Sequence, residues 1–455
     1  MRSLSLFQIS EWVDGALIQG VPAGLVGRVE TDSRRVGAGD LFIAIKGERL
    51  DAHKFLGDVA MAGAGAMLVS ALPPDTERFG GGIIRVKDTL KALQSLAYHH
   101  RRTSRDLFVT GVTGSNGKTS TKDFLTAVLA CGGSVNATSG NFNNHIGLPL
   151  TILAGNEGDR YGVWEMGMNH AGEIGVLADI ACPDAAVITH IGTAHIEHLG
   201  SREAIAAEKA SLAEAVPPGG FCAMPLHDDF YGFVRDRIRC EMVSVGIGQG
   251  DVRAEGLVSD REGRVRFELV SADTPPVTVS LPVRGEHMVM NALLAAAVGL
   301  RQGIDPVAIA ESLRSVRLTH GRLEERVVGG IAFLDDSYNA NPDSMHAALR
   351  TLRAAEIAGR RVAVLGFMGE LGVHEQTEHL RLGERVAEQG IDVLVTVGER
   401  AACINERASG LAENRNFPTH EEAAAFLREV LAAGDLVLVK GSRSAAMERV
   451  IAAFA

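Results

Sequence analysis

Residues 111–120 (GVTGSNGKTS) have the composition of a phosphate-binding loop. Glycines let backbone N–H groups converge on phosphate oxygens, a lysine reaches the β and γ oxygens, and a threonine hydroxyl can bind Mg²⁺. The loop is shorter than the usual pattern, which requires glycine where Val112 stands. The predicted phosphate-binding residues are Gly114, Ser115, Asn116, Gly117, Lys118, Thr119 and Ser120. An ordinary glycine-rich turn is the alternative, and the Lys-Thr pair at the expected helix start disfavours it.

Two later segments, 164–174 (WEMGMNHAGEI) and 190–209 (HIGTAHIEHLGSREAIAAEK), supply three more candidates for this chemistry: Glu165, His195 and Lys209. Each has an ordinary interpretation when taken alone. A glutamate after a strand is often solvated, a loop histidine is often structural, and a helical lysine usually faces solvent. The interest lies in their occurrence together, downstream of a phosphate loop.

Taken together, these residues suit a magnesium centre beside bound phosphates. Mg²⁺ prefers oxygen ligands and usually keeps waters and substrate phosphates among them. Two such ions need more anionic ligands than Thr119 and Glu165 supply. Lys209 can supply one only after carbamylation, which converts its ammonium group into an anion. The set therefore predicts ATP, two Mg²⁺ ions and a carbamylated lysine.

The composition sets limits on the class of protein. The 455 residues are 46% hydrophobic and 22% charged, with a formal net charge of −11. This charge argues against a nucleic-acid partner or a polybasic membrane surface. The five cysteines are scattered, which favours a reducing compartment. No apolar run approaches the roughly 20 residues that span a bilayer. Glu11 and Asp14 interrupt any secretory signal, so we expect a cytoplasmic protein.

The order of apolar runs and turns predicts three domains. Residues 1–84 indicate a small mixed domain. In residues 85–317, strand-like and helix-like segments alternate, which predicts a parallel sheet of the P-loop ATPase type. Apolar runs at 244–283 (VSVGIG, VRFELV and VTVSLPV) predict an added antiparallel sheet. Residues 318–455 contain four strand-like runs between helices, which predict a Rossmann-like domain. The expected fold class is therefore α/β.

Over nearly its whole length the chain resembles the Mur ligases, the ATP-dependent amide-forming enzymes of peptidoglycan precursor synthesis. The likeness includes the short phosphate loop, residues 141–151 (NFNNHIGLPLT), the glutamate of WEMG and the interval from His195 to Lys209. It implies ATP and Mg²⁺ as cofactors and an acyl phosphate as the intermediate.

Four segments resemble one branch of this family: 31–55, 334–345, 366–375 and 439–450. That branch joins D-alanyl-D-alanine to UDP-N-acetylmuramoyl-tripeptide. The sister enzyme that adds the third peptide residue is expected to carry DNPR in its C-terminal domain, and this chain lacks that motif.

The resemblance also implies roles for individual residues. The implied catalytic residues are Lys118, Lys209, His195 and Arg322; the metal ligands are Thr119 and Glu165, with His195 and carbamylated Lys209 on a second ion. The implied nucleotide contacts beyond the loop are Asn291, Arg322, Asp336 and Asn339. Met288 stands where the family often has a further adenine-contacting asparagine. The implied substrate contacts are Ser33, Arg34 and Lys46 for the UDP part, and Asn143, Asn144, Lys440 and Ser442 for the peptides.

Three alternatives stay open at this point. The chain could be the ligase that adds the third residue, or an enzyme like folylpolyglutamate synthase, which should lack a UDP-binding domain. It could also be a non-catalytic ATP switch, which would not need Glu165, His195 and Lys209 together. We expect a monomer. The sequence leaves open whether the third peptide residue is meso-diaminopimelate or lysine.

Overall fold

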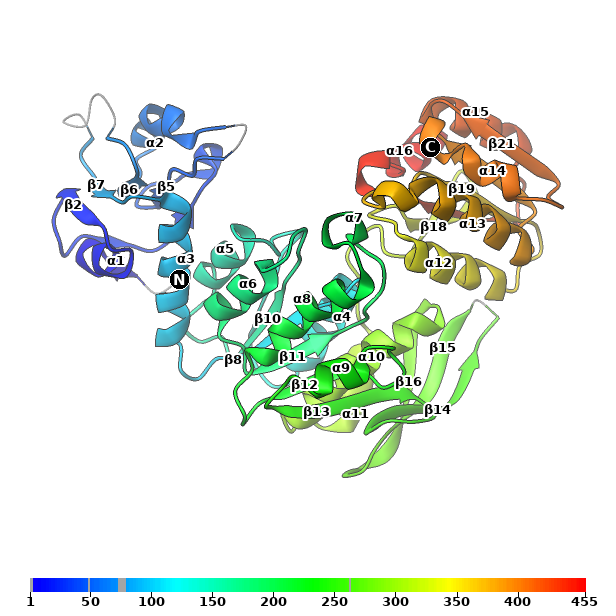
Figure 1. Ribbon diagram of the computed structural model, residues 1–455, viewed down its shortest axis with the longest axis horizontal. Coiled ribbons are helices and arrows are strands. Elements are labelled where there is room, and N and C mark those ends of the chain that lie inside the picture. The colour runs from blue at the N-terminus through cyan, green and yellow to red at the C-terminus, as the bar shows by residue number, and fades with distance from the viewer. Residues whose placement is uncertain (1–2, 48–49, 73–78, 262) are drawn as a thin grey trace.

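The computed structural model describes residues 3–47, 50–72, 79–261 and 263–455. Residues 48–49 of the resemblance segment 31–55 lie outside these ranges. The chain forms α/β domains around three large sheets, as the sequence predicts. The N-terminal and C-terminal domains lie at opposite ends of the central one (Figure 1).

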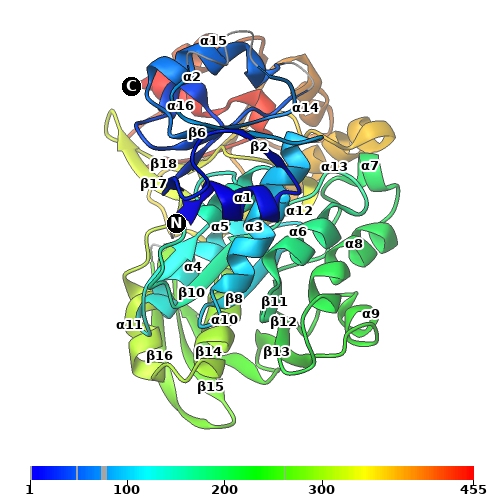
Figure 2. The same cartoon turned by 90° about the vertical axis from the view of Figure 1, so that its left-hand side faces the viewer.

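The N-terminal region pairs a five-stranded sheet, in the order β2-β7-β6-β5-β4, with a two-stranded sheet of β1 and β3. Its elements are β1 (Leu4–Ser5), α1 (Leu6–Trp12), β2 (Ala16–Gln19), β3 (Leu25–Val26), β4 (Val29–Glu30), β5 (Leu41–Ile43), α2 (Leu56–Met61), β6 (Ala66–Val69) and β7 (Gly82–Arg85). The long helix α3 (Thr89–Thr103) follows and packs on α1 and on two helices of the central region, α5 and α6. Figure 2 shows α1 and α3 side by side from the N-terminal end.

The central region contains one nine-stranded sheet in the order β16-β15-β14-β13-β12-β11-β8-β10-β9. Its strands are β8 (Phe108–Thr113), β9 (Val135–Ala137), β10 (Tyr161–Glu165), β11 (Ala185–Ile188), β12 (Phe221–Pro225), β13 (Glu241–Ile247), β14 (Val252–Ser259), β15 (Arg264–Ser271) and β16 (Thr274–Arg284). Its helices are α4 (Lys118–Ala130), α5 (Gly147–Leu153), α6 (Glu173–Ala181), α7 (Ile196–Leu199), α8 (Arg202–Glu214), α9 (Tyr231–Arg235), α10 (Glu286–Arg301) and α11 (Pro306–Arg314).

The antiparallel part of this sheet differs from the prediction in two respects. The run VSVGIG belongs to β13, which pairs in parallel with β12 and with β14, so its predicted antiparallel direction is wrong. The antiparallel pairs are β14–β15 and β15–β16. Strand β14 was not predicted, because its outer half, with Glu255 and Gly256, is mostly exposed and lacks a continuous apolar pattern.

The C-terminal region has a six-stranded sheet in the order β17-β18-β22-β19-β20-β21. Its strands are β17 (Glu324–Val328), β18 (Ile331–Asp336), β19 (Arg361–Leu365), β20 (Val393–Val397), β21 (Glu413–Phe417) and β22 (Leu436–Lys440). Its helices are α12 (Pro342–Ala354), α13 (Glu375–Glu388), α14 (Cys403–Arg407), α15 (His420–Val430) and α16 (Glu448–Phe454). The four predicted strands form the parallel centre of the sheet, and β17 and β21 extend its edges.

The two larger sheets direct their functional ends toward one another. Parallel strands place their carboxyl ends at one edge, where ligands bind in doubly wound folds. The carboxyl ends of β8 and β10 carry the glycine loop and Glu165, and those of β18 and β22 carry Asp336 and Lys440. None of the helices among the described residues is long and apolar enough to cross a membrane.

Candidate active site

The glycine loop joins β8 to α4, and two of its glycines are required by space and backbone conformation. Gly117 lies just before α4 with φ of 80°, and a Cβ there would come within 2.6 Å of Asn291 Oδ1. Gly114 has φ of 153°, and a Cβ there would lie 1.9 Å from Thr189 Oγ1. Side chains at these positions would push the loop away from its neighbours, so glycine is needed at both.

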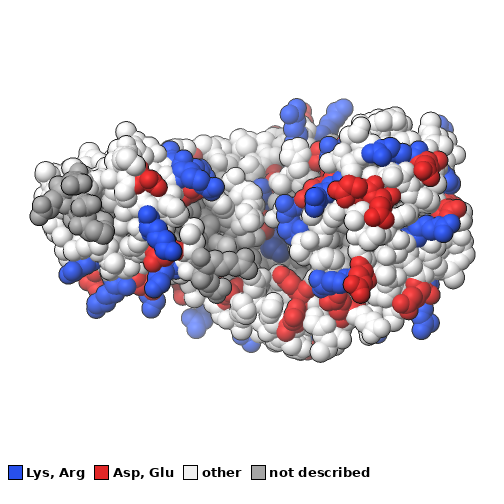
Figure 3. All heavy atoms as spheres, turned by 90° about the horizontal axis from the view of Figure 1, so that it is seen from above, with Lys and Arg blue, Asp and Glu red and all other residues white. Residues whose placement is uncertain are grey.

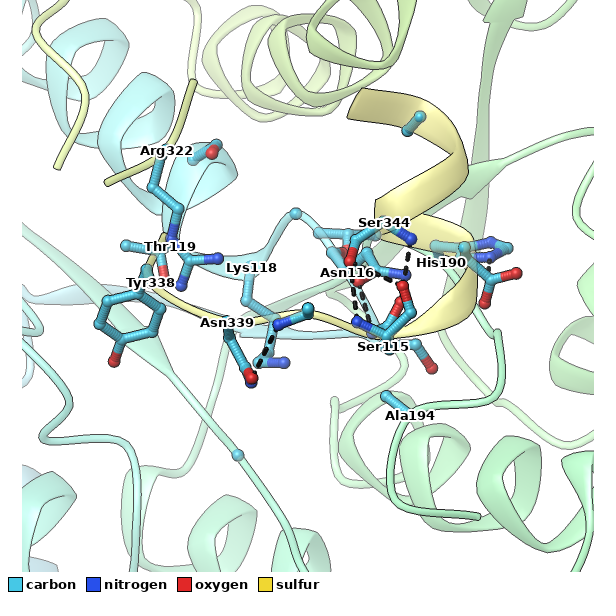
Figure 4. A pocket seen from close by; sticks show the side chains of 18 of the residues that line it. Ser115, Asn116, Lys118, Thr119, His190, Ala194, Arg322, Tyr338, Asn339 and Ser344 are labelled. Carbon is cyan, nitrogen blue, oxygen red and sulfur yellow. Dashed lines mark hydrogen bonds and ion pairs between the residues drawn. The ribbon is translucent and has the colours of Figure 1, made fainter. Parts of the chain in front are cut away.

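A neighbouring segment, residues 189–192, braces the loop from the end of β11. The Ser115 N–H donates to the His190 carbonyl at 2.7 Å, and Ser115 Oγ accepts from the Gly192 N–H at 2.9 Å. The Thr189 hydroxyl donates to the Asn116 carbonyl. Figure 4 shows Ser115, Asn116, Lys118 and Thr119 along the loop, with His190 at its far side. The loop is therefore held in shape before any ligand binds.

Lys118 and Thr119 begin α4, where the helix dipole also favours bound anions. Lys118 Nζ donates to the Gly114 carbonyl at 2.7 Å, and burial lowers the pKa of its ammonium group. Thr119 Oγ1 donates to Glu165 Oε2 at 3.0 Å and accepts from Arg322 Nη2 at 3.2 Å. The central and C-terminal regions thus meet at one threonine hydroxyl.

The surroundings of Glu165 suit a cation. The residue is only 3% exposed, and its two carboxylate oxygens accept from neutral donors, Thr119 Oγ1 and Asn143 Nδ2, the latter at 2.8 Å. No cationic group donates a hydrogen bond directly to this carboxylate, although the charge of Lys118 is close enough to interact with it. Together with the Thr119 hydroxyl the carboxylate offers the hard oxygen ligands that Mg²⁺ prefers. Within the described residues, no group of three His, Cys, Asp or Glu side chains is arranged to hold a metal ion by itself.

Lys209 lies on the buried face of α8 and is 1% exposed. Burial lowers the pKa of its amine well below the usual value, and the nearby charge of Lys118 lowers it further. Among the described residues, no group forms a hydrogen bond or ion pair with this amine. Both effects on the pKa favour the uncharged form of the amine, which is the form that reacts with CO₂, so the environment fits the predicted carbamate.

His195 precedes α7 in a left-handed conformation, with φ of 65°. Its Nδ1 atom lies 2.6 Å from Oε2 of Glu370, which comes from the C-terminal region. This contact lowers the pKa of the Glu370 carboxyl group. The sequence suggested His195 but gave no role to Glu370, although GFMGELGVHE (366–375) was among the segments of resemblance.

One cavity of about 1070 Å³ connects most of these groups. Sixteen predicted residues line it: Ser115, Asn116, Gly117, Lys118, Thr119, Ser120, Asn143, Asn144, Glu165, His195, Asn291, Arg322, Asp336, Asn339, Lys440 and Ser442. Gly114 and Lys209 do not line it: Gly114 directly precedes the lining loop, and Lys209 on α8 lies close enough to Lys118 for the charge of Lys118 to lower the pKa of its amine. Arg322, Tyr338 and Asn339 face the glycine loop across it (Figure 4).

Asn291 and Met288 occupy adjacent turns of α10 at the cavity wall, and both are buried. The Asn291 Nδ2 group donates to the Met288 sulfur at 3.6 Å. Sulfur is a weak acceptor, but here it orients the amide. Met288 therefore helps to hold the side-chain amide of Asn291, the predicted adenine contact, in one orientation.

Asp336 and Lys440 form a buried ion pair at the ends of β18 and β22. Lys440 Nζ donates to Asp336 Oδ2 at 2.5 Å and to the Asn339 carbonyl at 2.9 Å. The other Asp336 oxygen accepts from the Leu323 N–H at 3.2 Å, next to Arg322. The pair thus fixes the segment that carries Arg322.

The remaining predicted substrate residues have differing surroundings. The Asn144 side-chain oxygen accepts from two backbone N–H groups at the start of α5, at 2.9 and 3.1 Å, while Ser442 is buried beside the cavity. Ser33, Arg34 and Lys46 do not line the cavity. Arg34 instead pairs with Asp32 on the exposed surface of the N-terminal domain.

Two further residues of the C-terminal region make contacts at the site that the sequence did not predict. Asn341 Nδ2 donates to Asn116 Oδ1 at 2.8 Å, which ties the start of α12 to the glycine loop. The Tyr338 ring lies 4.1 Å from the guanidinium carbon of Arg322, within range of a cation–π interaction. Both belong to segment 334–345, which the resemblance had already singled out. The sequence therefore indicated the segment, but it could not predict which of its residues contact the glycine loop and Arg322.

This fold and site define the chain as a member of the Mur ligase family. Three family profiles match it: "Mur ligase family, catalytic domain" at residues 26–101, "Mur ligase middle domain" at 112–299 and "Mur ligase, glutamate ligase domain" at 321–443.

Named relatives place the chain near one branch. It is 38% identical to UDP-N-acetylmuramoyl-tripeptide–D-alanyl-D-alanine ligase of Bacillus subtilis, with 93% of this chain and 92% of that protein covered. The crystal structure of MurF from Acinetobacter baumannii matches with a TM-score of 0.92 at 33% identity, over 100% of this chain and 99% of that one. MurF ligase from Thermotoga maritima in complex with ADP matches with a TM-score of 0.83 at 30% identity, over 94% and 96%.

Proposed function

We propose that this protein is an ATP-dependent ligase that joins D-alanyl-D-alanine to UDP-N-acetylmuramoyl-tripeptide. The products are UDP-N-acetylmuramoyl-pentapeptide, ADP and phosphate. The observation that carries the proposal is the meeting of the phosphate loop, buried Glu165 and Arg322 in one cavity between two domains. The name of the relative that is 38% identical over 93% of the chain supports the choice of substrates.

The reaction needs ATP because a carboxylate does not react with an amine at neutral pH. Transfer of the γ-phosphoryl group to the terminal carboxylate of the tripeptide gives an acyl phosphate. The amine of D-alanyl-D-alanine then attacks the carbonyl carbon, and phosphate leaves with one of the original carboxylate oxygens. Phosphoryl transfer depends mainly on positioning and charge neutralisation. The cationic side chains of Lys118 and Arg322 would supply both at the phosphates.

The metal ligands that we propose are Thr119, Glu165, His195 and Lys209 as its carbamate. Bound Mg²⁺ would neutralise the phosphate charges and polarise the transferring group. Glu165 and Thr119 hold their oxygen atoms together through their own hydrogen bond, so this part of the site is pre-organised.

Lys209→Ala should remove nearly all ligase activity, because the buried position would lose its anion. We expect activity to return in part when a short carboxylate such as formate or acetate is supplied, since the cavity left by the side chain can admit it. Full activity in the unsupplemented variant would exclude the carbamate, and an inactive variant that no carboxylate rescues would contradict its role as a replaceable anion.

The domain arrangement suits an intermediate that water must not reach. Residues of the C-terminal region, among them Tyr338 and Asn339, cover the glycine loop across the cavity. Enclosure of this kind keeps water from a reactive acyl phosphate. The UDP part of the substrate would contact the N-terminal domain, through Ser33, Arg34 and Lys46. We further propose that the enzyme acts in the cytoplasm, as a monomer.

The direct test measures phosphate release from ATP and Mg²⁺ with UDP-N-acetylmuramoyl-tripeptide, in the presence and absence of D-alanyl-D-alanine. We expect release to depend on both substrates and the product mass to increase by one dipeptide unit. A second tripeptide, with lysine in place of meso-diaminopimelate, tests the third residue. Release that is indifferent to the dipeptide would contradict the proposal and favour another amine acceptor or an ATP switch.

A further inference from the structure

The contact between His195 and Glu370 is a place where a carboxylate of the C-terminal domain reaches a proposed metal ligand of the central domain. The two residues come from different domains, and Nδ1 of His195 lies 2.6 Å from Oε2 of Glu370. The Nδ1 side of the imidazole therefore faces this carboxylate at close range. The other ring nitrogen, Nε2, forms no hydrogen bond with the described residues.

The backbone on both sides of this contact is in an uncommon conformation. Glu370 has φ of 61° and His195 has φ of 65°. Few residues other than glycine adopt such values, and they persist where the surrounding structure imposes them. Leu371, next to Glu370, is 2% exposed and belongs to the large hydrophobic core that the central and C-terminal regions share, which anchors the segment. The conformation thus directs the Glu370 carboxylate toward the central domain.

Other contacts across the same boundary show that the two segments are docked and do not merely lie near each other. The Glu197 N–H donates to the Glu370 carbonyl at 3.4 Å. Nearby, the Thr193 N–H donates to Asp343 Oδ2 at 3.2 Å. Segment 193–197, which contains His195, is therefore held by the Glu370 loop and by the first turn of α12. If the C-terminal domain moved away, the imidazole would lose its only charged partner among the described residues.

We propose that Glu370 is a positioning residue that orients the His195 imidazole for the metal ion, so that this ligand is complete only when the C-terminal domain is docked. The inference rests on the proposed function. Metal-binding histidines commonly present one nitrogen to the metal while a carboxylate or carbonyl fixes the other, and loss of that partner typically costs 10–100-fold in metal affinity or activity. Glu370 would act through His195 and would not itself touch the substrate.

This arrangement links metal binding to domain closure. The Nδ1–H of His195 is imperfectly aligned with the Glu370 oxygen, since the pair satisfies the distance of an ion pair but not the angle of a hydrogen bond. A cation bound at Nε2 would strengthen the attraction between the Nδ1 side of the ring and the Glu370 carboxylate, and would thereby favour the docked domain arrangement.

The test measures Mn²⁺ binding, as a spectroscopic substitute for Mg²⁺, by electron paramagnetic resonance with the whole chain and a non-hydrolysable ATP analogue. We expect two classes of bound Mn²⁺ in the parent protein. Glu370→Ala should lower the Mn²⁺ affinity of the weaker-binding class 10–100-fold. Glu370→Gln, which keeps an oxygen acceptor, should weaken it less. The matched control is Glu197→Gln, which removes one exposed carboxylate from the same docked segment and should change Mn²⁺ affinity less than about twofold.

A second measurement distinguishes positioning from general destabilisation. In Glu370→Ala the Mg²⁺ concentration for half-maximal phosphate release should rise, and saturating Mg²⁺ should restore most of the rate. The midpoint of thermal unfolding should stay close to that of the parent. Unchanged Mn²⁺ affinity in both Glu370 variants, with an active parent, would overturn this inference alone. A parent protein without substrate-dependent phosphate release would instead overturn the proposed function.

Discussion

At the scale of single residues, the site is organised around buried charges that the protein itself does not fully neutralise. Glu165 accepts hydrogen bonds only from neutral donors, and burial lowers the pKa of the Lys118 ammonium group. Burial of unpaired charge costs stability unless a ligand compensates it. ATP and metal ions would provide that compensation. The site is therefore pre-organised for these ligands, and the protein without them is less stable than it would be without the buried charges.

Lys440 provides a prediction at this scale, because its amine is already engaged by Asp336 and the Asn339 carbonyl. Lys440→Met should lower the free energy of unfolding by about 3–5 kcal/mol, since it leaves a buried carboxylate unpaired. Adding Asp336→Asn should recover part of this loss, which chemical denaturation of the single and double variants can measure. If Lys440 mainly contacts the dipeptide, the single variant would instead raise KM for D-alanyl-D-alanine and leave the unfolding free energy unchanged.

At the scale of elements, the start of α12 is shared between two tasks. Asn341 caps the helix, because its side-chain oxygen accepts from the Ser344 N–H at 2.9 Å and Ser344 Oγ accepts from the Asn341 N–H at 3.0 Å. The remaining Nδ2 group donates to Asn116 in the glycine loop. One side chain thus stabilises its own helix and positions the phosphate loop of the neighbouring domain.

Replacement of Asn341 can separate these two tasks. Asn341→Asp keeps the cap, so the unfolding free energy should change by less than about 0.5 kcal/mol, but it removes the donor to Asn116. KM for ATP should then rise roughly 2–10-fold, the usual range for one hydrogen bond. Asn341→Ala should in addition lose about 1 kcal/mol of stability with the cap. An unchanged KM for ATP in Asn341→Asp would show that the tie to the loop has no part in nucleotide binding.

Local and long-range features differ in how well the sequence predicts them. The glycine loop was predictable because its strand, turn and helix are consecutive and its glycines have a local steric reason. The direction of β13 was not predictable, because apolar alternation looks the same in parallel and antiparallel strands. The contact between Asn116 and Asn341 joins positions 225 residues apart, and the contact between Glu370 and His195 crosses the same domain boundary. Such pairs depend on domain docking, which no local pattern encodes.

At the scale of the whole molecule, the cavity is lined by the central and C-terminal regions, and the N-terminal domain lies at the opposite end of the molecule from the C-terminal domain (Figures 1 and 2). On the face shown in Figure 3, acidic and basic side chains are interspersed without a large basic area. Within the cavity, Lys118 and Arg322 are the basic side chains nearest the Thr119 hydroxyl of the glycine loop.

His287 links the pH dependence of stability to this cavity. Desolvation at the start of α10 lowers its pKa to about 4, whereas the unfolded chain titrates near the ordinary value of about 6.5. Below pH 6.5 the imidazole of the unfolded chain binds a proton more readily than that of the folded chain. The folded state therefore has its full stability above pH 6.5, and the free energy of unfolding decreases as the pH falls toward 4. Between pH 7 and 4.5 the parent should therefore lose roughly 2 kcal/mol more than His287→Gln. Urea unfolding at several pH values measures the difference, and identical pH profiles would exclude this role.

The central claim, that the cavity activates a carboxylate through an acyl phosphate, is tested most directly with oxygen isotopes. UDP-N-acetylmuramoyl-tripeptide labelled with ¹⁸O in its terminal carboxylate would be incubated with ATP, Mg²⁺ and D-alanyl-D-alanine, and the released phosphate would be analysed by mass spectrometry. The account predicts one ¹⁸O atom in each phosphate released from fully labelled substrate, because the bridging oxygen of the acyl phosphate leaves with it. Unlabelled phosphate would show that water takes the phosphoryl group, which would contradict ligase chemistry at this site.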